Sequence, residues 1–294
     1  MTALERRYRR LLLAYPRQYR TAHGDELLDV LLESAAPGRS LPVPREAWGL
    51  ILGGLRSRIV HQATGSAWAD GLHLGVTAVS AANLAALLPY AGSLPVWTLL
   101  SALALLATLR GRVRAAIPLT GVAAVKAVAI AGGRPVFDLT LLPVSPSWLT
   151  DGGLFAWSSP FVVGAGYAVA LSGLVVLAWR GQPPRARSWW WWAAVVAVAW
   201  AGPQWLPEDN TVPLSLSRVV VELAAFGLAA TGAYLARDLR WALAAGLYLP
   251  VASGELILHL NGLTRQHTAY WGLLVLLTLV SALAPYRQRR HCLD

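Results

Sequence analysis

The chain has few of the residues on which soluble enzymes and secreted domains depend. Only one of its 294 residues is a cysteine, Cys292, which excludes a disulfide within the chain and a cysteine-ligated metal site. Charged residues make up 14% of the sequence, against about 25% in soluble domains, and 56% of the residues are hydrophobic. This composition predicts an integral membrane protein.

Lysine is nearly absent as well, since arginine supplies 24 of the 25 basic residues, which we interpret as codon bias. The sequence has no Gly-rich phosphate loop, no nucleophile elbow and no His-Glu-x-x-His pair. The apolar segment 11–14 is too short to serve as a cleavable signal peptide. We therefore expect no cofactor and favour a non-enzymatic function, with an enzyme acting on lipid as an alternative.

Long apolar runs dominate the rest of the chain. About 20 apolar residues cross the roughly 30 Å of hydrocarbon in a bilayer as a helix, and about eight such runs follow residue 66. The runs are Gly71–Ala91, Leu94–Leu109, Val113–Ala131, Pro160–Trp179, Trp190–Leu206, Pro213–Ala236, Trp241–Leu260 and Ala269–Tyr286. They predict an all-α, polytopic transmembrane helix bundle over residues 66–286. Because the second and fifth runs are short, seven spans with one re-entrant segment is the alternative.

The arginines predict the orientation of this bundle. Of the 24 arginines, 21 lie in the first 65 residues, in alternate loops and in the basic tail 287–294, while the opposite loops keep only Arg134 and Arg265. By the positive-inside rule, both termini face the cytoplasm, and we expect the bacterial plasma membrane as the location. The small-xxx-small pair of Gly71 and Gly75 indicates a close helix contact, but the oligomeric state is left open.

Residues 1–65 predict a small cytoplasmic helical domain. Its first helix is amphipathic and ends before Pro16, and Gly24 is expected to break the chain before a helix from Asp25 to about Ser34. A further helix is expected over 46–62, with Trp48, Leu52 and Leu55 among the residues of one side. The pair Gly53-Gly54 weakens that helix by about 1 kcal/mol per glycine, so we expect docking to support it.

The order of residues in this domain also resembles a known module. Arg6-Arg7-Tyr8-Arg9 precedes Tyr15-Pro16, Tyr19-Arg20 and Gly24-Asp25-Glu26-Leu27-Leu28. This pattern resembles the HAAS or permease-prefix module of bacterial, actinobacterial-type integral membrane proteins. The resemblance implies a cytoplasmic partner, either a PadR-type transcription regulator or an ABC-type ATPase. The residues of this sequence that carry it are Tyr15, Pro16, Tyr19, Arg20, Gly24 and Glu26.

Ionisable and polar residues inside the spans are the only candidates for a site in the bundle. Such groups are costly in hydrocarbon and often mark function. They are Asn83, Lys126, Arg218, Glu222, Glu255 and His259. At 1.5 Å per residue, the first five come to one layer in the outer half of the bilayer, where the formal charges cancel. The layer is either a structural salt-bridge network or an outward-opening cavity that binds a ligand. Asp70 and His73 are interpreted as ordinary interface residues.

The remaining features leave two classes of function open. Glu255 and His259 share a helix face, but two ligands do not make a metal site. The loop 132–159 is apolar for an exposed segment, which indicates an interfacial connector or, alternatively, a lid or sensing surface. We favour a regulatory or signalling partner that couples the bundle to a cytoplasmic protein, with a transporter for an ion or small solute as the alternative. The basic first helix is expected to face lipid or water, and direct binding to nucleic acid is not expected.

Overall fold

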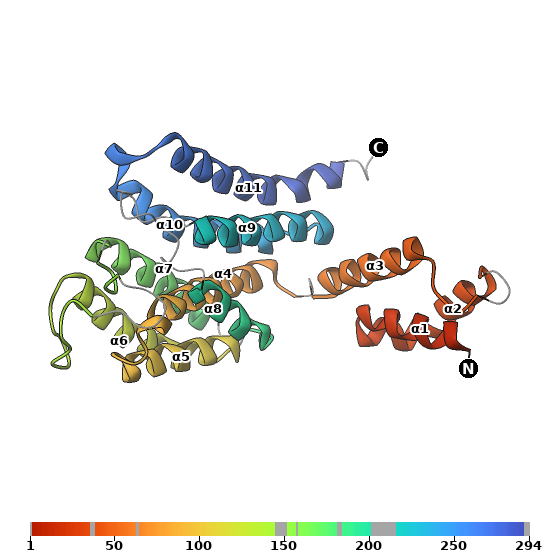
Figure 1. Cartoon of the computed structure of the whole chain (residues 1–294), viewed down its shortest axis with the longest axis horizontal. Coiled ribbons are helices and arrows are strands. Elements are labelled where there is room, and N and C mark those ends of the chain that lie inside the picture. The colour runs from red at the N-terminus through yellow and green to blue at the C-terminus, as the bar shows by residue number, and fades with distance from the viewer. Residues whose placement is uncertain are drawn as a thin grey trace. The chain divides into compact units, whose positions relative to one another are not determined.

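The computed structural model describes residues 2–35, 39–62, 65–144, 152–156, 158–180, 184–200 and 216–290. The described residues form helices and contain no strands (Figure 1). The chain divides into two compact units, of which the first comprises Met1–Gly65 with Leu235–Asp238 and the second comprises Ser66–Tyr234 with Leu239–Asp294. The fold class is therefore all-α, as the apolar runs predict.

The first unit contains α1 (Ala3–Leu11), the 3-10 turn η1 (Leu12–Ala14), α2 (Arg17–Glu33) and α3 (Pro44–Gln62). Thr2 and Glu5 form a capping box at the start of α1, which satisfies free backbone N–H groups there. The helices enclose a small core of Leu4, Tyr8, Leu12, Leu28 and Leu50.

The predicted break at Gly24 is wrong, because α2 runs without interruption from Arg17 to Glu33. Pro16 occupies the N-cap position of this helix, where its missing N–H costs nothing. A glycine inside a helix costs only about 1 kcal/mol, and the burial of Leu28 in the core offsets that cost. Asp25 and Glu26 therefore lie in the middle of α2 and not at a helix start.

The second unit contains the apolar helices. Their bounds are α4 Ala67–Leu87, α5 Pro95–Leu109, α6 Val113–Ala131, α7 Pro160–Trp179, α8 Trp190–Trp200, α9 Leu216–Ala236, α10 Arg240–Leu258 and α11 Arg265–Arg290. Among the described residues, six helices are long and apolar enough to cross a membrane, namely α4, α6, α7, α9, α10 and α11. The helices α5 and α8 are shorter, and the predicted fifth run continues past Trp200 into residues outside the described ranges. Since α11 reaches Arg290, the first part of the predicted tail is helical.

Helix α4 is central to this unit, because it packs against α5, α7, α8 and α10. Its two glycines allow the closest approach: a Cβ added at Gly71 would lie 2.7 Å from the carbonyl oxygen of Arg240, and one at Gly75 would lie 2.8 Å from the side chain of Leu247. The close contact predicted for this glycine pair is therefore confirmed, and its partner is α10. A separate cluster joins α9, α10 and α11 through Phe226, Ala245, Ala252, Leu256, Tyr270 and Leu274.

Candidate functional site

Two of the residues that carry the module resemblance lie together in the first unit. The rings of Tyr15 and Tyr19 stack with their centroids 5.0 Å apart. Tyr15 is half-buried, and its burial, with Tyr19 as a second cause, raises the pKa of its phenol. A Cβ added at Gly53 would lie 2.5 Å from the Tyr15 hydroxyl oxygen, so α3 approaches this ring through a glycine. Pro16 starts α2 directly beside the pair.

The other module residues do not join this pair in a pocket. Arg20 is half-buried on α2, and a Cβ added at Gly24 would touch its Cβ atom at 3.8 Å, one turn along the same face. Glu26 is exposed beside His23, with 3.7 Å between the carboxylate oxygen and the ring nitrogen. Arg20, Gly24 and Glu26 thus lie along α2 and form no pocket with the tyrosine pair.

Helix α3 is held to the rest of the first unit by polar contacts at both ends. The Tyr8 hydroxyl donates a hydrogen bond to Glu46 Oε2 at 2.6 Å, and burial, followed by this bond, raises the pKa of Tyr8 to about 12. At the other end, the Arg58 guanidinium donates to the carbonyl oxygens of Ala14 and, at 2.6 Å, Leu13. The orientation of α3 about its own axis is therefore fixed.

This orientation leaves α3 with two opposite apolar faces. The face toward the core carries Leu50 and the glycine pair, where a Cβ on Gly54 would lie 2.8 Å from the Ala14 backbone. Trp48, Leu52 and Leu55 recur at i, i+4 and i+7 on the other side and are 62%, 50% and 49% exposed. We refer to these three residues as the α3 stripe. The first unit does not need them for its own core.

The second unit has a charged network at one end of its bundle. Asp70, near the start of α4, accepts a hydrogen bond from Arg187 on Oδ1 and another from Arg240 on Oδ2, each at 2.6 Å. Arg240 begins α10 and is 3% exposed, and Arg187 lies in the segment before α8. We refer to this end as the arginine-rich end, since the backbone of Arg187 bonds to Leu109, next to the turn that carries Arg110, Arg112 and Arg114.

His73 extends the network toward α5. Its Nε2 lies 2.8 Å from the carbonyl oxygen of Thr108, and its Nδ1 accepts a hydrogen bond from Arg187 Nε at 3.2 Å. Both contacts are satisfied by a neutral ring that carries its proton on Nε2. Asp70 and His73 are therefore not ordinary interface residues. They join three helices and the segment before α8, and that interpretation of the sequence was wrong.

Lys126 lies near the other end of the bundle and is 2% exposed. Its ammonium group donates to the Val136 carbonyl oxygen and to Thr140 Oγ1, each at 3.0 Å, and it forms an ion pair with Asp138. The Trp97 indole N–H donates to the second carboxylate oxygen of Asp138 at 2.6 Å. The hydrogen bond from Lys126, with further bonds from Thr140 and Trp97, holds the pKa of Asp138 well below its usual range.

A second ion pair lies on α9 and is bonded to α11. Arg218 Nε donates to Glu222 Oε1 at 2.9 Å, one helical turn away, and the Tyr270 hydroxyl donates to the other oxygen of Glu222. Glu222 is 5% exposed. Both oxygens of this carboxylate therefore have partners, as a buried charge requires.

The predicted layer is not one network. Lys126 pairs with a loop acid, and α6 packs against α5 and α7. Glu222 instead bonds to Tyr270, which belongs to the cluster of α9, α10 and α11. A rise of about 1.5 Å per residue predicts how deep a residue lies in the bilayer, but not which neighbouring helix its side chain faces. The sequence therefore could not separate Lys126 from Glu222. Lys126 therefore has its ion-pair partner outside the predicted layer.

Glu255 and Asn83 each keep one buried polar atom without a hydrogen-bond partner in the described part of the chain, and His259 does not. Glu255 is 6% exposed, and its Oε2 has no hydrogen-bond partner there. The Nδ2 atom of the half-buried Asn83 also has no hydrogen-bond partner among the described residues. His259 ends α10 and places its Nδ1 2.9 Å from the backbone oxygen of Glu255.

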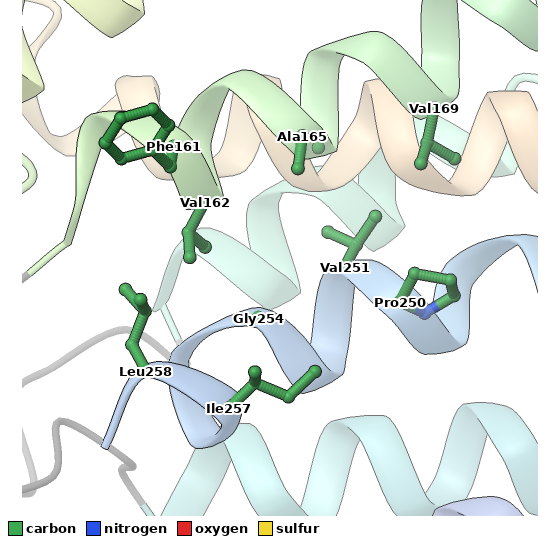
Figure 2. A pocket seen from close by; sticks show the side chains of 10 residues that line it. Phe161, Val162, Ala165, Val169, Pro250, Val251, Gly254, Ile257 and Leu258 are labelled. Atoms are coloured by element: carbon green, nitrogen blue, oxygen red, sulfur yellow. The ribbon is translucent and has the colours of Figure 1, made fainter. Parts of the chain in front are cut away.

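An apolar groove lies between α7 and α10 and has a volume of about 210 Å³. Figure 2 shows Val162 of α7 pointing toward α10 and Val251 of α10 pointing toward α7. A Cβ on Gly254 would lie 2.7 Å from Val162, so the two helices touch at the floor of the groove. Every lining residue is apolar, which leaves no group that could orient a polar ligand.

Within the described ranges, no group of three or more His, Cys, Asp or Glu residues is arranged to hold a metal ion. The described residues thus offer three polar groups with ion pairs, an exposed stripe on α3 and an apolar groove. Comparison with protein-family models, curated proteins and solved structures gave no match to this chain.

Proposed function

We propose that the chain is a membrane-bound regulatory or signalling protein whose first unit binds a cytoplasmic protein. The observation that carries this proposal is the α3 stripe. Three large apolar side chains on one helix face, opposite the core of a small unit, are about half exposed or more and lie outside that core. Spacing of i, i+4 and i+7 is the pattern of a helix that lies in the apolar groove of a partner protein.

The proposal includes an orientation of the membrane part. The six long helices, with α5 and α8 as two further crossings, make about eight spans with both termini in the cytoplasm of a bacterial cell. Exposed arginines on the α5–α6 turn and before α8 support this orientation, since the arginine-rich end then faces inward. The first unit then lies in the same compartment as a soluble regulator.

The orientation of the bundle in the membrane is tested by removing Cys292 and introducing one cysteine at a chosen position. Cysteines at Ala186 and at Arg134, each in a Cys292→Ser background, should differ toward an impermeant thiol reagent added to intact cells. Labelling at position 134 with protection at 186 is expected, because the two exposed positions lie at opposite ends of the bundle. Labelling of both positions to the same extent would contradict the proposed orientation.

Partner binding is tested by crosslinking through the stripe. A photoreactive amino acid at Leu52 of the full chain should crosslink to one cytoplasmic protein, and Trp48→Ser should weaken that crosslink at least fivefold. Val30→Ser is the matched control, because Val30 is 59% exposed on α2 of the same unit. A PadR-type regulator as the crosslinked protein would support the module resemblance, and an ATPase subunit would favour a permease.

Crosslinks to lipid alone would overturn the proposal. A crosslink that is equally strong in Trp48→Ser and in the wild-type chain would also overturn it, because the stripe would then not be the binding surface. Trp48, Leu52 and Leu55 are exposed, so we expect these substitutions to leave the fold of the first unit unchanged.

Transport of an ion or small polar solute is the second candidate. Glu255 favours it, since a buried carboxylate oxygen without a partner in the described residues can bind a proton or cation. The test is uptake by proteoliposomes that contain the wild-type chain or Glu255→Gln. Cation or proton uptake that Glu255→Gln abolishes would establish transport, and equal leakage in both samples would exclude it.

A further inference from the structure

The segment 136–144 follows α6 and has two different sides, and we call it the strap. Its inward positions are Val136, Asp138 and Thr140, which contact Lys126, followed by Leu142 and Val144, which pack on the cluster around Tyr90 and Leu94. Its outward positions between them are Phe137, Leu139 and Leu141, which are 64%, 95% and 87% exposed. The strap is therefore an irregular, bent segment with a polar attachment on one side and large apolar side chains on the other.

The inward contacts prevent the strap from turning over. Three oxygen atoms of the strap surround the Lys126 ammonium group, and Trp97 holds the second oxygen of Asp138. Phe137 has a φ of 71°, in the left-handed region that non-glycine residues avoid, and its ring stacks on Trp97 at 5.7 Å. A strained backbone conformation of this kind persists only when contacts of the surrounding structure hold it in place.

The level of the strap follows from α6. That helix has 19 residues and is about 28 Å long, close to the roughly 30 Å of hydrocarbon. Lys126 lies five residues before the end of α6, roughly 7.5 Å below it. By bonding to Lys126, the strap stays at the end of the bundle instead of extending into water.

The outward side of the strap lies beside the first turn of α5, which carries exposed apolar residues. Val96 and Leu99 are 67% and 61% exposed and lie in the same part of α5 as Trp97, on a helix that packs against α4 and α6. The Phe137 ring stacks on Trp97 itself. The apolar side chains of the strap therefore adjoin the apolar surface of the spans, with no charged side chain among its outward positions.

We infer that the outward face of the strap, Phe137, Leu139 and Leu141, is inserted among the acyl chains of the bilayer leaflet at this end of the bundle. The free energy falls when large apolar side chains leave water. On the opposite side, polar bonds to Lys126 hold the strap to the bundle. The strap thereby couples lipid contact to α5 and α6 through Trp97 and Lys126. This inference is independent of the α3 stripe.

The inference is tested by spin labelling of the full chain. Leu139→Cys in a Cys292→Ser background is labelled with a nitroxide and placed in nanodiscs of phosphatidylcholine and phosphatidylglycerol. Collisions are measured with oxygen, which concentrates in lipid, and with a nickel chelate, which remains in water. We expect the oxygen-to-nickel collision ratio at Leu139 to exceed that of the control Arg134→Cys at least threefold. Leu141→Cys should behave as Leu139→Cys does.

Three outcomes would overturn the inference. Equal ratios at 134, 139 and 141 would place the strap in water. Low collision rates with both reagents, accompanied by spin–spin broadening, would show that a second copy of the chain covers it. Low rates with both reagents and no broadening would show that another part of the same chain covers it. Since Leu139 and Leu141 are almost fully exposed, labelling either position should leave the fold intact.

Discussion

Asp70 and Arg240 lie 170 residues apart in the chain, yet Arg240 Nη1 donates to Asp70 Oδ2 at 2.6 Å. Breaking a buried ion pair on one side leaves an uncompensated charge, at a cost of about 3–5 kcal/mol. We therefore expect Asp70→Asn to destabilise the second unit by about 3 kcal/mol, because the carboxylate is partly exposed. Thermal unfolding in detergent should show it as a lower Tm, by roughly 2–4 °C per kcal/mol.

The control for this prediction is Asp25→Asn, because the Asp25 side chain is 95% exposed and its ion pair with Arg9 is long, at 3.9 Å. Surface pairs of this kind contribute about 0–1 kcal/mol. If the two variants unfold at the same temperature, the Asp70 network does not hold the helices together.

The second prediction concerns the glycines of α3. Gly54→Ala should destabilise the first unit, since the new Cβ would lie 2.8 Å from the Ala14 backbone. Gly49→Ala should stabilise it by about 1 kcal/mol, because nothing lies within 4 Å of the new Cβ and alanine favours a helix. Amide hydrogen exchange of α3 in the full chain measures both effects. Equal protection in the two variants would contradict the packing of α3 on η1.

The third prediction is the alkaline titration of Tyr8. A phenol whose pKa is raised in the folded state contributes stability that is complete below its ordinary value of about 10 and is lost as the pH rises through the folded value. For Tyr8 that value is about 12. The tyrosinate absorbance of the full chain should show a step near pH 12 that Tyr8→Phe lacks. Glu46→Gln should move the step to lower pH, and an unchanged step would exclude the Tyr8–Glu46 hydrogen bond.

The fourth prediction is the behaviour of the strap in acid. A carboxylate whose pKa is depressed contributes stability above its ordinary value of about 3.9, and this is lost as the pH falls through the lower folded value. Since Lys126 is the main cause of the low pKa of Asp138, the strap should keep its contacts between pH 7 and pH 4. The mobility of a nitroxide at Leu139 measures this. In Lys126→Met, the mobility of the same nitroxide should rise near pH 4. If mobility depends on pH identically with Lys126 and with methionine, Lys126 does not hold the strap.

The sequence predicts the helices of the second unit well where apolar runs have clear ends. The bounds of α6 and α7 agree with the predicted runs, because arginines, glycines and prolines flank about 20 apolar residues. The break at Gly24 was a local signal that tertiary packing overrides, since Leu28 contributes to the core of the first unit.

The polar sites were harder to predict, because their partners are distant in the sequence. Asp70 bonds to Arg187, 117 residues away, and no helical periodicity links two such positions. A useful signal was present nonetheless: Asp70 is an acid at the end of the bundle where most loop arginines gather. For Lys126, the partner Asp138 was visible in the sequence as a loop acid, but depth alone could not choose it over Glu222.

The only lysine of the chain occupies the position where an ammonium group and a guanidinium differ most. An ammonium nitrogen carries three hydrogens arranged as a tripod, and three oxygens of the strap surround Lys126 Nζ. A guanidinium is a flat fork and cannot direct three bonds from one atom, so Lys126→Arg would not be a conservative change. In a chain with 24 arginines, the exception to the arginine preference therefore has a geometric reason at this one position.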